Sequence, residues 1–138
     1  MEKTFAIIKP DATRDGNTGK ILERIEAKGF KIVAMKKMLM TKQIAEGFYA
    51  EHSSKPFYGP LTDFMSSGPC TVMVLEMDGA IKAWRDFMGA TNPEQAEPGT
   101  LRNEFGKNID NNAVHGSDAP ATAEREIKYF FSELEIVG

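Results

Sequence analysis

The sequence predicts an α+β domain built on a split βαβ plan. Three apolar runs, at 4–8, 30–40 and 70–77, have the composition of strands, and the second is rich in methionine. The segments between and after these runs carry apolar residues at helical spacing. Because a helical insertion separates two of the strands, this order of elements favours the split βαβ, or ferredoxin-like, arrangement.

The first strand is predicted at Thr4–Ile8 and ends before Pro10, whose ring nitrogen has no hydrogen to donate to a sheet. Apolar residues between 21 and 25 then share one face of a helix. Gly29 follows as a C-terminal stop signal. The N-terminal part of the chain therefore reads as strand, helix and second strand.

Helices are also predicted in the middle of the chain. Thr41 has the side chain of a helix cap, and the helix runs to about Ala50. Residues 56–67 predict a compact helical hairpin closed by Ser-Ser-Gly-Pro, and residues 79–88 predict a third major helix. These segments flank the strand at 70–77.

Regular periodicity stops between Gly89 and Asn112. Irregular segments of this length are uncommon in compact domains and are usually functional. A short apolar pair then leads into His115, which we expect in a short strand or at a strand end. Pro120 opens a last helix that runs to about Phe131.

The composition limits the classes of function. The chain has 138 residues, which fits one domain over 1–138, and its 20 acidic and 17 basic residues give a net charge of −3. This balance argues against a general nucleic-acid binder. A single cysteine favours a reducing compartment, and no apolar stretch approaches the ~20 residues that span a bilayer. We expect a cytoplasmic protein that does not bind membranes.

Three charged residues interrupt apolar patterns. Lys9 ends the period-two row of the first strand, while Arg85 and Glu126 lie on the margins of apolar helical stripes. One interpretation is that each long side chain reaches to water. The other is that a cleft which needs charge opens at these positions.

The two histidines have different contexts. His52 reads equally well as a solvated helix end, whereas His115 follows the long irregular segment and precedes Gly-Ser-Asp. Small residues there allow close approach to a ligand. No Cys or His partner lies at metal-ligand spacing, which argues against zinc, and no Gly-x-Ser-x-Gly motif supports a hydrolase.

Common phosphate-binding and RNA-binding motifs are incomplete. Residues 16–20 resemble a P-loop, but the glycine spacing is wrong and no Ser or Thr follows the lysine. Residues 28–33 partly match the core of an RNA-recognition motif. However, Lys31, Ile32 and Met35 replace the small and aromatic residues which that motif uses.

Seven segments, in order and spacing, resemble the nucleoside diphosphate kinase family from end to end, with the last the most specific: Thr4–Asp11, Lys28–Phe30, Pro56–Tyr58, Ser67–Pro69, Gly89–Pro93, Pro98–Arg102 and Asn112–Asp118. The resemblance implies a ferredoxin-like α/β sandwich with a four-stranded antiparallel sheet covered by helices. It implies transfer of the γ-phosphate of a nucleoside triphosphate, mainly ATP, to nucleoside diphosphates. It also implies Mg²⁺, a phosphohistidine intermediate and ping-pong kinetics.

The resemblance also implies roles for individual residues. His115 matches the nucleophile, phosphorylated on Nδ1, and Glu126 and Ser117 match the pair that orients its ring. The positions that match phosphate and sugar contacts are Lys9, Arg85, Thr91, Arg102 and Asn112. Phe57 matches the ring that stacks on the base, Tyr49, Leu61 and Ile109 match neighbours that line the site, and His52 is a secondary candidate.

The chemistry of these residues fits that reaction. A neutral imidazole has a free lone pair, and a hydrogen bond from Nε2–H to a backbone carbonyl would leave Nδ1 of His115 free to attack. Lys9, Arg85 and Arg102 would stabilise phosphate charge. No carboxylate cage for Mg²⁺ is evident, so we expect the ion to arrive on the phosphates. Stacking on Phe57 predicts broad base specificity.

The resemblance also implies an oligomer. Short members of the family more often form tetramers, so we expect a homotetramer, with a hexamer as the rival. The competing function is a nucleotide- or RNA-binding regulatory module on the same fold, without turnover. Phosphate labelling of His115 distinguishes an enzyme from such a module.

Overall fold

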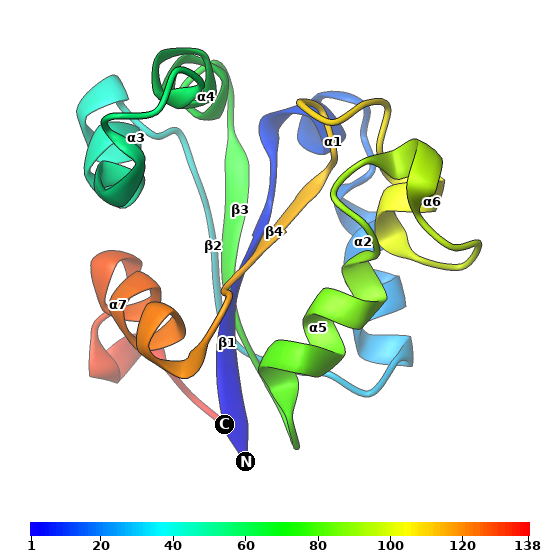
Figure 1. Ribbon diagram of the computed structural model, residues 1–138. Coiled ribbons are helices and arrows are strands. Elements are labelled where there is room, and N and C mark those ends of the chain that lie inside the picture. Colours follow the sequence, from blue (N-terminus) through cyan, green and yellow to red (C-terminus); the bar gives the residue numbers. More distant parts are fainter.

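The computed structural model describes all residues, 1–138, and contains one antiparallel sheet. Its strands, in the order β2–β3–β1–β4, are β1 (Glu2–Ile8), β2 (Lys31–Met38), β3 (Cys70–Met77) and β4 (Val114–Gly116). β1 is therefore central, and the short β4 pairs along its outer side (Figure 1). The predicted ferredoxin-like α+β fold is confirmed.

Helices cover both faces of this sheet (Figure 1). The helices are α1 (Pro10–Arg14), α2 (Thr18–Ala27), α3 (Lys42–Phe48), α4 (Tyr58–Met65), α5 (Ala80–Met88), α6 (Leu101–Phe105) and α7 (Pro120–Phe130). α2, α5 and α6 contribute to one core, and α3, α4 and α7 contribute to the other. No helix has the length and apolar character needed to cross a bilayer.

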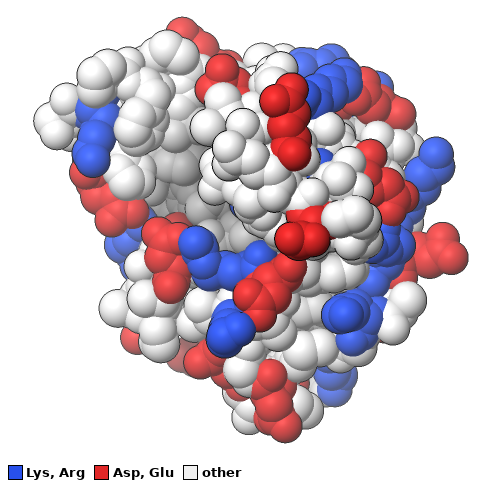
Figure 2. All heavy atoms as spheres, turned by 45° about the vertical axis from the view of Figure 1, so that its right-hand side comes forward, with Lys and Arg blue, Asp and Glu red and all other residues white.

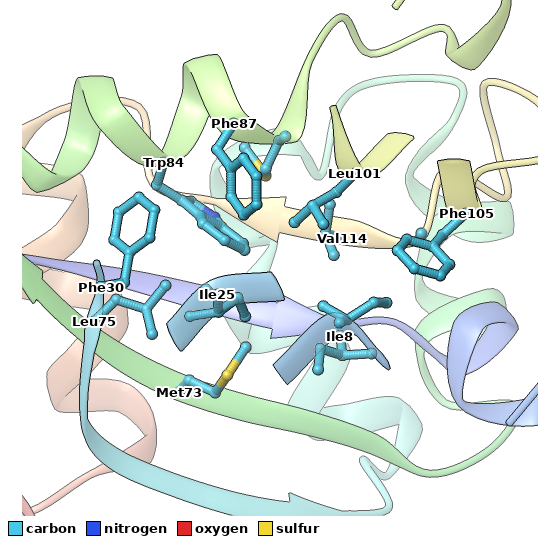
Figure 3. Close-up of a cluster of buried hydrophobic side chains, with 14 of the residues drawn as sticks. Ile8, Ile25, Phe30, Met73, Leu75, Trp84, Phe87, Leu101, Phe105 and Val114 are labelled. Atoms are coloured by element: carbon cyan, nitrogen blue, oxygen red, sulfur yellow. The ribbon is translucent and has the colours of Figure 1, made fainter. Parts of the chain in front are cut away.

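Both faces of β1 are buried, because its successive side chains point to opposite cores. Phe5 and Ile7 belong to the core under α3 and α7, whereas Ala6 and Ile8 belong to the core under α2 and α5. Figure 3 shows the core that contains Ile8, where side chains from α2, α5 and α6 pack against the sheet. The apolar run in the sequence thus reflects a strand with no solvent face.

Several predicted boundaries agree with the structure. The strand at 70–77 has the expected bounds. Thr41 caps α3, because its hydroxyl oxygen accepts a hydrogen bond from Ile44 N–H at 3.1 Å. The segment 56–67 contains the single helix α4 rather than a hairpin; it packs beside α3, and together they make the helical pair.

Two short helices were missed. Pro10 does not simply follow the strand but begins α1, where its fixed φ suits the first helical position. The segment 89–112 is not wholly irregular, because it contains a 3₁₀ turn at Pro93–Gln95 and the helix α6. Thr100 caps α6 by accepting from Asn103 N–H. A five-residue helix is too short to show a periodic pattern.

Candidate active site

His115 lies at the middle of β4, next to the central strand. Its Cα pairs with that of Ile7, and its carbonyl accepts a hydrogen bond from the Trp84 indole at 3.1 Å. Gly116 makes this possible, because a Cβ there would collide with the indole. The sequence identified Trp84 only as a core residue; a buried indole N–H needs an acceptor, and this one lies on the candidate nucleophile.

Aromatic side chains surround the imidazole of His115. Its ring centroid lies 5.4 Å from Phe48, 6.2 Å from Phe5 and 6.3 Å from Tyr49, each in an edge-to-face arrangement. Its side chain keeps 19% of its surface exposed. Burial, followed by the negative charge of Glu126, raises the pKa of Tyr49, so this phenol stays neutral. These contacts hold the ring in one orientation while an edge stays open to solvent.

Glu126 and Ser117 form the orienting pair for the ring. Oε1 of Glu126 lies 3.1 Å from Nε2 of His115, and the Ser117 hydroxyl donates to the same oxygen at 2.7 Å. Burial by itself would raise the pKa of Glu126, but the hydrogen bonds and charges of His115, Ser117 and Arg125 lower it. An ionised carboxylate only accepts, so Nε2 carries the hydrogen and Nδ1 has the lone pair.

This arrangement corrects the expected partner of Nε2–H. The acceptor is the carboxylate of Glu126 rather than a backbone carbonyl, and Glu126 contacts His115 directly while it also accepts from Ser117. The family resemblance assigned Glu126 to orient the ring, but the residues next to His115 give no sign of it, because Glu126 is on α7 and reaches β4 only in the folded chain. Its 3% exposure confirms that Glu126 turns inward from the stripe margin.

Lys9 is buried at the end of β1, as its place in the apolar row predicts. Its ammonium donates to Asn112 Oδ1 at 2.8 Å, and the side chain of Asn112 also donates to the carbonyls of Thr91 and Ile109. Burial and then the charge of Arg102 lower the pKa of Lys9 to about 8. The structure thus brings four of the predicted residues into one connected group.

The two arginines differ in their environment. Arg102 is 9% exposed and donates to the carbonyls of Gly89 and Val114, at 3.1 and 2.8 Å. Burial and then the charge of Arg85 lower its pKa to about 10, so it stays protonated at pH 7. Arg85 is instead exposed and pairs with Asp118 at 2.6 Å. For Arg85, the structure therefore agrees with the interpretation that its long side chain reaches from the stripe margin to water.

Four of the residues predicted to line the base site, His52, Tyr49, Phe57 and Leu61, lie on the α3–α4 side, whereas Ile109 is exposed in the segment between α6 and β4. Phe57 is 48% exposed just before α4, and its ring centroid lies 5.6 Å from that of His52. Leu61 packs against the core under α4, and Tyr49 contacts His115 instead of Phe57. Phe57 is thus an exposed aromatic ring beside the imidazole of His52.

Figure 2 shows one face of the molecule, which is hollowed and carries basic and acidic side chains side by side. A local cluster of cations on such a surface can bind phosphate even though the chain is acidic overall. No group of three or more His, Cys, Asp or Glu side chains is placed to hold a metal ion. The cations Lys9, Arg85 and Arg102 are the groups suited to bind anions.

The amino-acid sequence matches known proteins over nearly its whole length. The family described as nucleoside diphosphate kinase matches residues 2–136. A nucleoside diphosphate kinase of Desulfotalea psychrophila is 62% identical over 137 residues, which is 99% of this chain and 100% of that protein. The chain belongs to the nucleoside diphosphate kinase family. It is accordingly a phosphotransferase that moves phosphate between nucleotides, and a non-catalytic binding module is not favoured.

Solved structures agree with this membership. The nucleoside diphosphate kinase of Aquifex aeolicus has a TM-score of 0.97 and 45% identity, and the match covers 99% of each chain. A nucleoside diphosphate kinase of Halobacterium salinarum, solved in complex with CDP, has a TM-score of 0.95 and 42% identity, covering 99% of this chain and 91% of that one. The family predicted from the sequence segments is confirmed.

Proposed function

We propose that His115 carries the phosphate between the two nucleotides. The Nδ1 lone pair attacks the γ-phosphorus of a nucleoside triphosphate, the bond from that phosphorus to the β,γ-bridging oxygen breaks, and a nucleoside diphosphate leaves. A terminal oxygen of a second nucleoside diphosphate then attacks the phosphohistidine and regenerates Nδ1. The hydrogen bond between Nε2 and Glu126 supports this proposal, because it leaves Nδ1 unprotonated and stabilises positive charge on the ring.

The cations are proposed to stabilise charge on the transferred group. Lys9 and Arg102 are already immobilised by Asn112 and by backbone carbonyls, so their charges need little reorganisation during the reaction. Arg85 would exchange its ion pair with Asp118 for a phosphate oxygen. Thr91 and Asn112 would contribute polar contacts at the same place.

Mg²⁺ is proposed to be held by phosphate oxygens and water, where it would neutralise charge on the nucleotide. The donor set agrees with this role, because the side chains around His115 and Lys9 offer no cluster of carboxylates to hold the ion themselves. The protein's own contribution is then to bind the phosphates of the magnesium nucleotide and place them in line with Nδ1.

The base is proposed to stack on Phe57, with His52, Leu61 and Ile109 near it. Stacking recognises the face that all bases share, so we propose broad base and sugar specificity. The CDP complex of the Halobacterium salinarum relative is consistent with a pyrimidine ligand. We further propose that the chain acts as one domain in a cytoplasmic homotetramer rather than a hexamer.

Labelling with γ-³²P ATP tests the assignment of His115. We expect an acid-labile, alkali-stable phosphoprotein that loses its label when any nucleoside diphosphate is added. Because the chain contains only two histidines, peptide mapping separates His115 from His52. His115→Asn should remove the label while the circular dichroism spectrum is unchanged. Label on His52, or on any other residue, would contradict the proposed nucleophile.

A further inference from the structure

A strained turn immediately precedes the strand of His115. Ala113 has a φ of +72° and is the only non-glycine residue in the chain with a positive φ. Val114 N–H donates to the carbonyl of Asn112 at 2.9 Å. A hydrogen bond from residue i+2 to residue i, around a positive φ, defines the rare and strained form of the γ-turn. Such a conformation persists only where its surroundings hold it in place.

The segment that follows β1 holds both polar backbone groups of Ala113. Lys9 N–H donates to the Ala113 carbonyl at 2.8 Å, and Ala113 N–H donates to Oδ2 of Asp11 at 3.1 Å. Ala113 itself is fully buried, so neither backbone group has water as an alternative partner. The carboxylate of Asp11 is therefore the one side chain that holds the amide of the turn.

Asp11 is a costly residue at this position. It is 2% exposed, its second oxygen has no hydrogen-bond partner, and no lysine or arginine lies within ion-pair distance. Burial of a carboxylate with so few partners is unfavourable. The sequence places Asp11 in a segment that resembles the family, yet assigns it no role.

We propose that Asp11 is a positioning residue, whose carboxylate holds the γ-turn at Ala113 and thereby places Asn112 and His115. On one side of the turn, the Asn112 side chain receives the ammonium of Lys9. On the other side, β4 begins and carries His115. This inference rests on the proposed role of His115 in phosphate transfer.

The negative charge of Asp11 also supports the contact between Lys9 and Asn112. Burial and then Arg102 lower the pKa of Lys9, whereas the negative charges of Asp11 and Asp110 raise it. Asp11 therefore also helps keep the Lys9 ammonium protonated for its contact with Asn112. The two effects are separable, because Asn in place of Asp keeps an acceptor oxygen and removes the charge.

A double-mutant cycle tests whether Asp11 acts through the turn. Asp11→Ala should slow phosphorylation of His115 by ATP, in single turnover, by about tenfold or more. In an Ala113→Gly background the loss should be at least about threefold smaller, because glycine adopts a positive φ without strain. A merely structural role of Asp11 would give the same loss in both backgrounds, and that result, or no loss at all, overturns the proposal.

A conservative variant and a matched control complete the experiment. Asp11→Asn keeps an acceptor for Ala113 N–H and should stay within about threefold of the unmodified rate at about pH 6.5, where Lys9 stays protonated. A loss of about tenfold or more in Asp11→Asn overturns the proposal, and this comparison with the unmodified chain holds even if Asp11→Ala does not fold. Asp15→Ala, which removes a surface ion pair with Lys107 from the same segment, is the control. The unmodified chain is labelled in parallel, so failure of the proposed nucleophile is seen separately.

Discussion

Oε1 of Glu126 lies 3.1 Å from Nε2 of His115 and accepts a second hydrogen bond from Ser117. One buried carboxylate on α7 thus sets both the orientation and the protonated nitrogen of a ring on β4. A charged acceptor of this kind stabilises the positive charge that develops on the imidazole when Nδ1 is phosphorylated.

Replacement of Glu126 tests this relationship. Glu126→Gln keeps the shape but removes the charge, and its amide can donate to Nε2 and favour the wrong tautomer. We expect phosphorylation by ATP to slow by about 10- to 100-fold, which corresponds to the loss of a charged hydrogen bond. Stopped-flow or quench-flow measurement of the first half-reaction checks this. An unchanged rate would show that the carboxylate is not needed.

The lowered pKa of Glu126 also predicts a pH dependence of stability. A carboxyl whose folded pKa lies below its ordinary 4.5 adds stability above that pH and loses it as the pH falls through the folded value. The difference in unfolding free energy between the unmodified chain and Glu126→Gln should therefore narrow below about pH 4.5. Urea unfolding at several pH values measures it. A difference that widens in acid would contradict the direction of the shift.

Lys9 predicts an alkaline limit to activity. Because its pKa is about 8, kcat/KM, which reports the free enzyme, should fall above about pH 8. Bound phosphate favours the ammonium, so kcat should fall only at higher pH. In Lys9→Arg the guanidinium cannot lose its charge in this pH range, so kcat/KM should not fall above pH 8, even if its value is lower throughout. If kcat/KM of Lys9→Arg still falls near pH 8, the titrating group is not Lys9.

Replacement of Arg85 should lower activity alone, whereas replacement of Arg102 should lower both activity and stability. Arg85→Ala should lower kcat/KM by about 10²- to 10³-fold, as loss of a donor to the transition state does, with little effect on unfolding. Arg102→Ala should lower activity and also destabilise the fold by about 1–3 kcal/mol, because the buried carbonyl of Val114 and the part-buried carbonyl of Gly89 lose their guanidinium partner.

Urea unfolding and steady-state kinetics on both arginine variants check these expectations. Lys82→Ala, on the same helix as Arg85 and equally able to lose a surface ion pair, is the control. Equal activity of Arg85→Ala and the Lys82→Ala control would place the phosphate site elsewhere.

Replacement of Phe57 should weaken the binding of all nucleoside diphosphates to a similar extent. Loss of one base-stacking contact corresponds to about 1–3 kcal/mol, so Phe57→Ala should raise KM by about tenfold or more for purine and pyrimidine diphosphates, with kcat less affected. Phe57→Tyr keeps a ring and should restore most of the affinity. Steady-state kinetics with several diphosphates measures both. A large effect on one base only would contradict stacking as the basis of recognition.

The amino-acid sequence alone determined the fold class, the strand at 70–77, the Thr41 cap and the family, because these depend on local periodicity and on short motifs. It also identified Lys9 and Glu126 as charges in buried rows, and the structure confirms that both are buried. It missed α1 and α6, since helices of five residues carry no period to detect. It left the direction of the Arg85 side chain open, because a stripe margin does not say which way a long side chain turns.

Tertiary structure decided which groups on different helices and strands come into contact. Glu126 reaches His115 only because α7 packs against β1 beside β4, and Asp11 reaches Ala113 only because the chain after β1 meets the start of β4. The contact between Asp11 and Ala113 has no signature in local sequence, since a hydrogen bond across about a hundred residues depends on which strands become neighbours. The order β2–β3–β1–β4 makes the two segments neighbours.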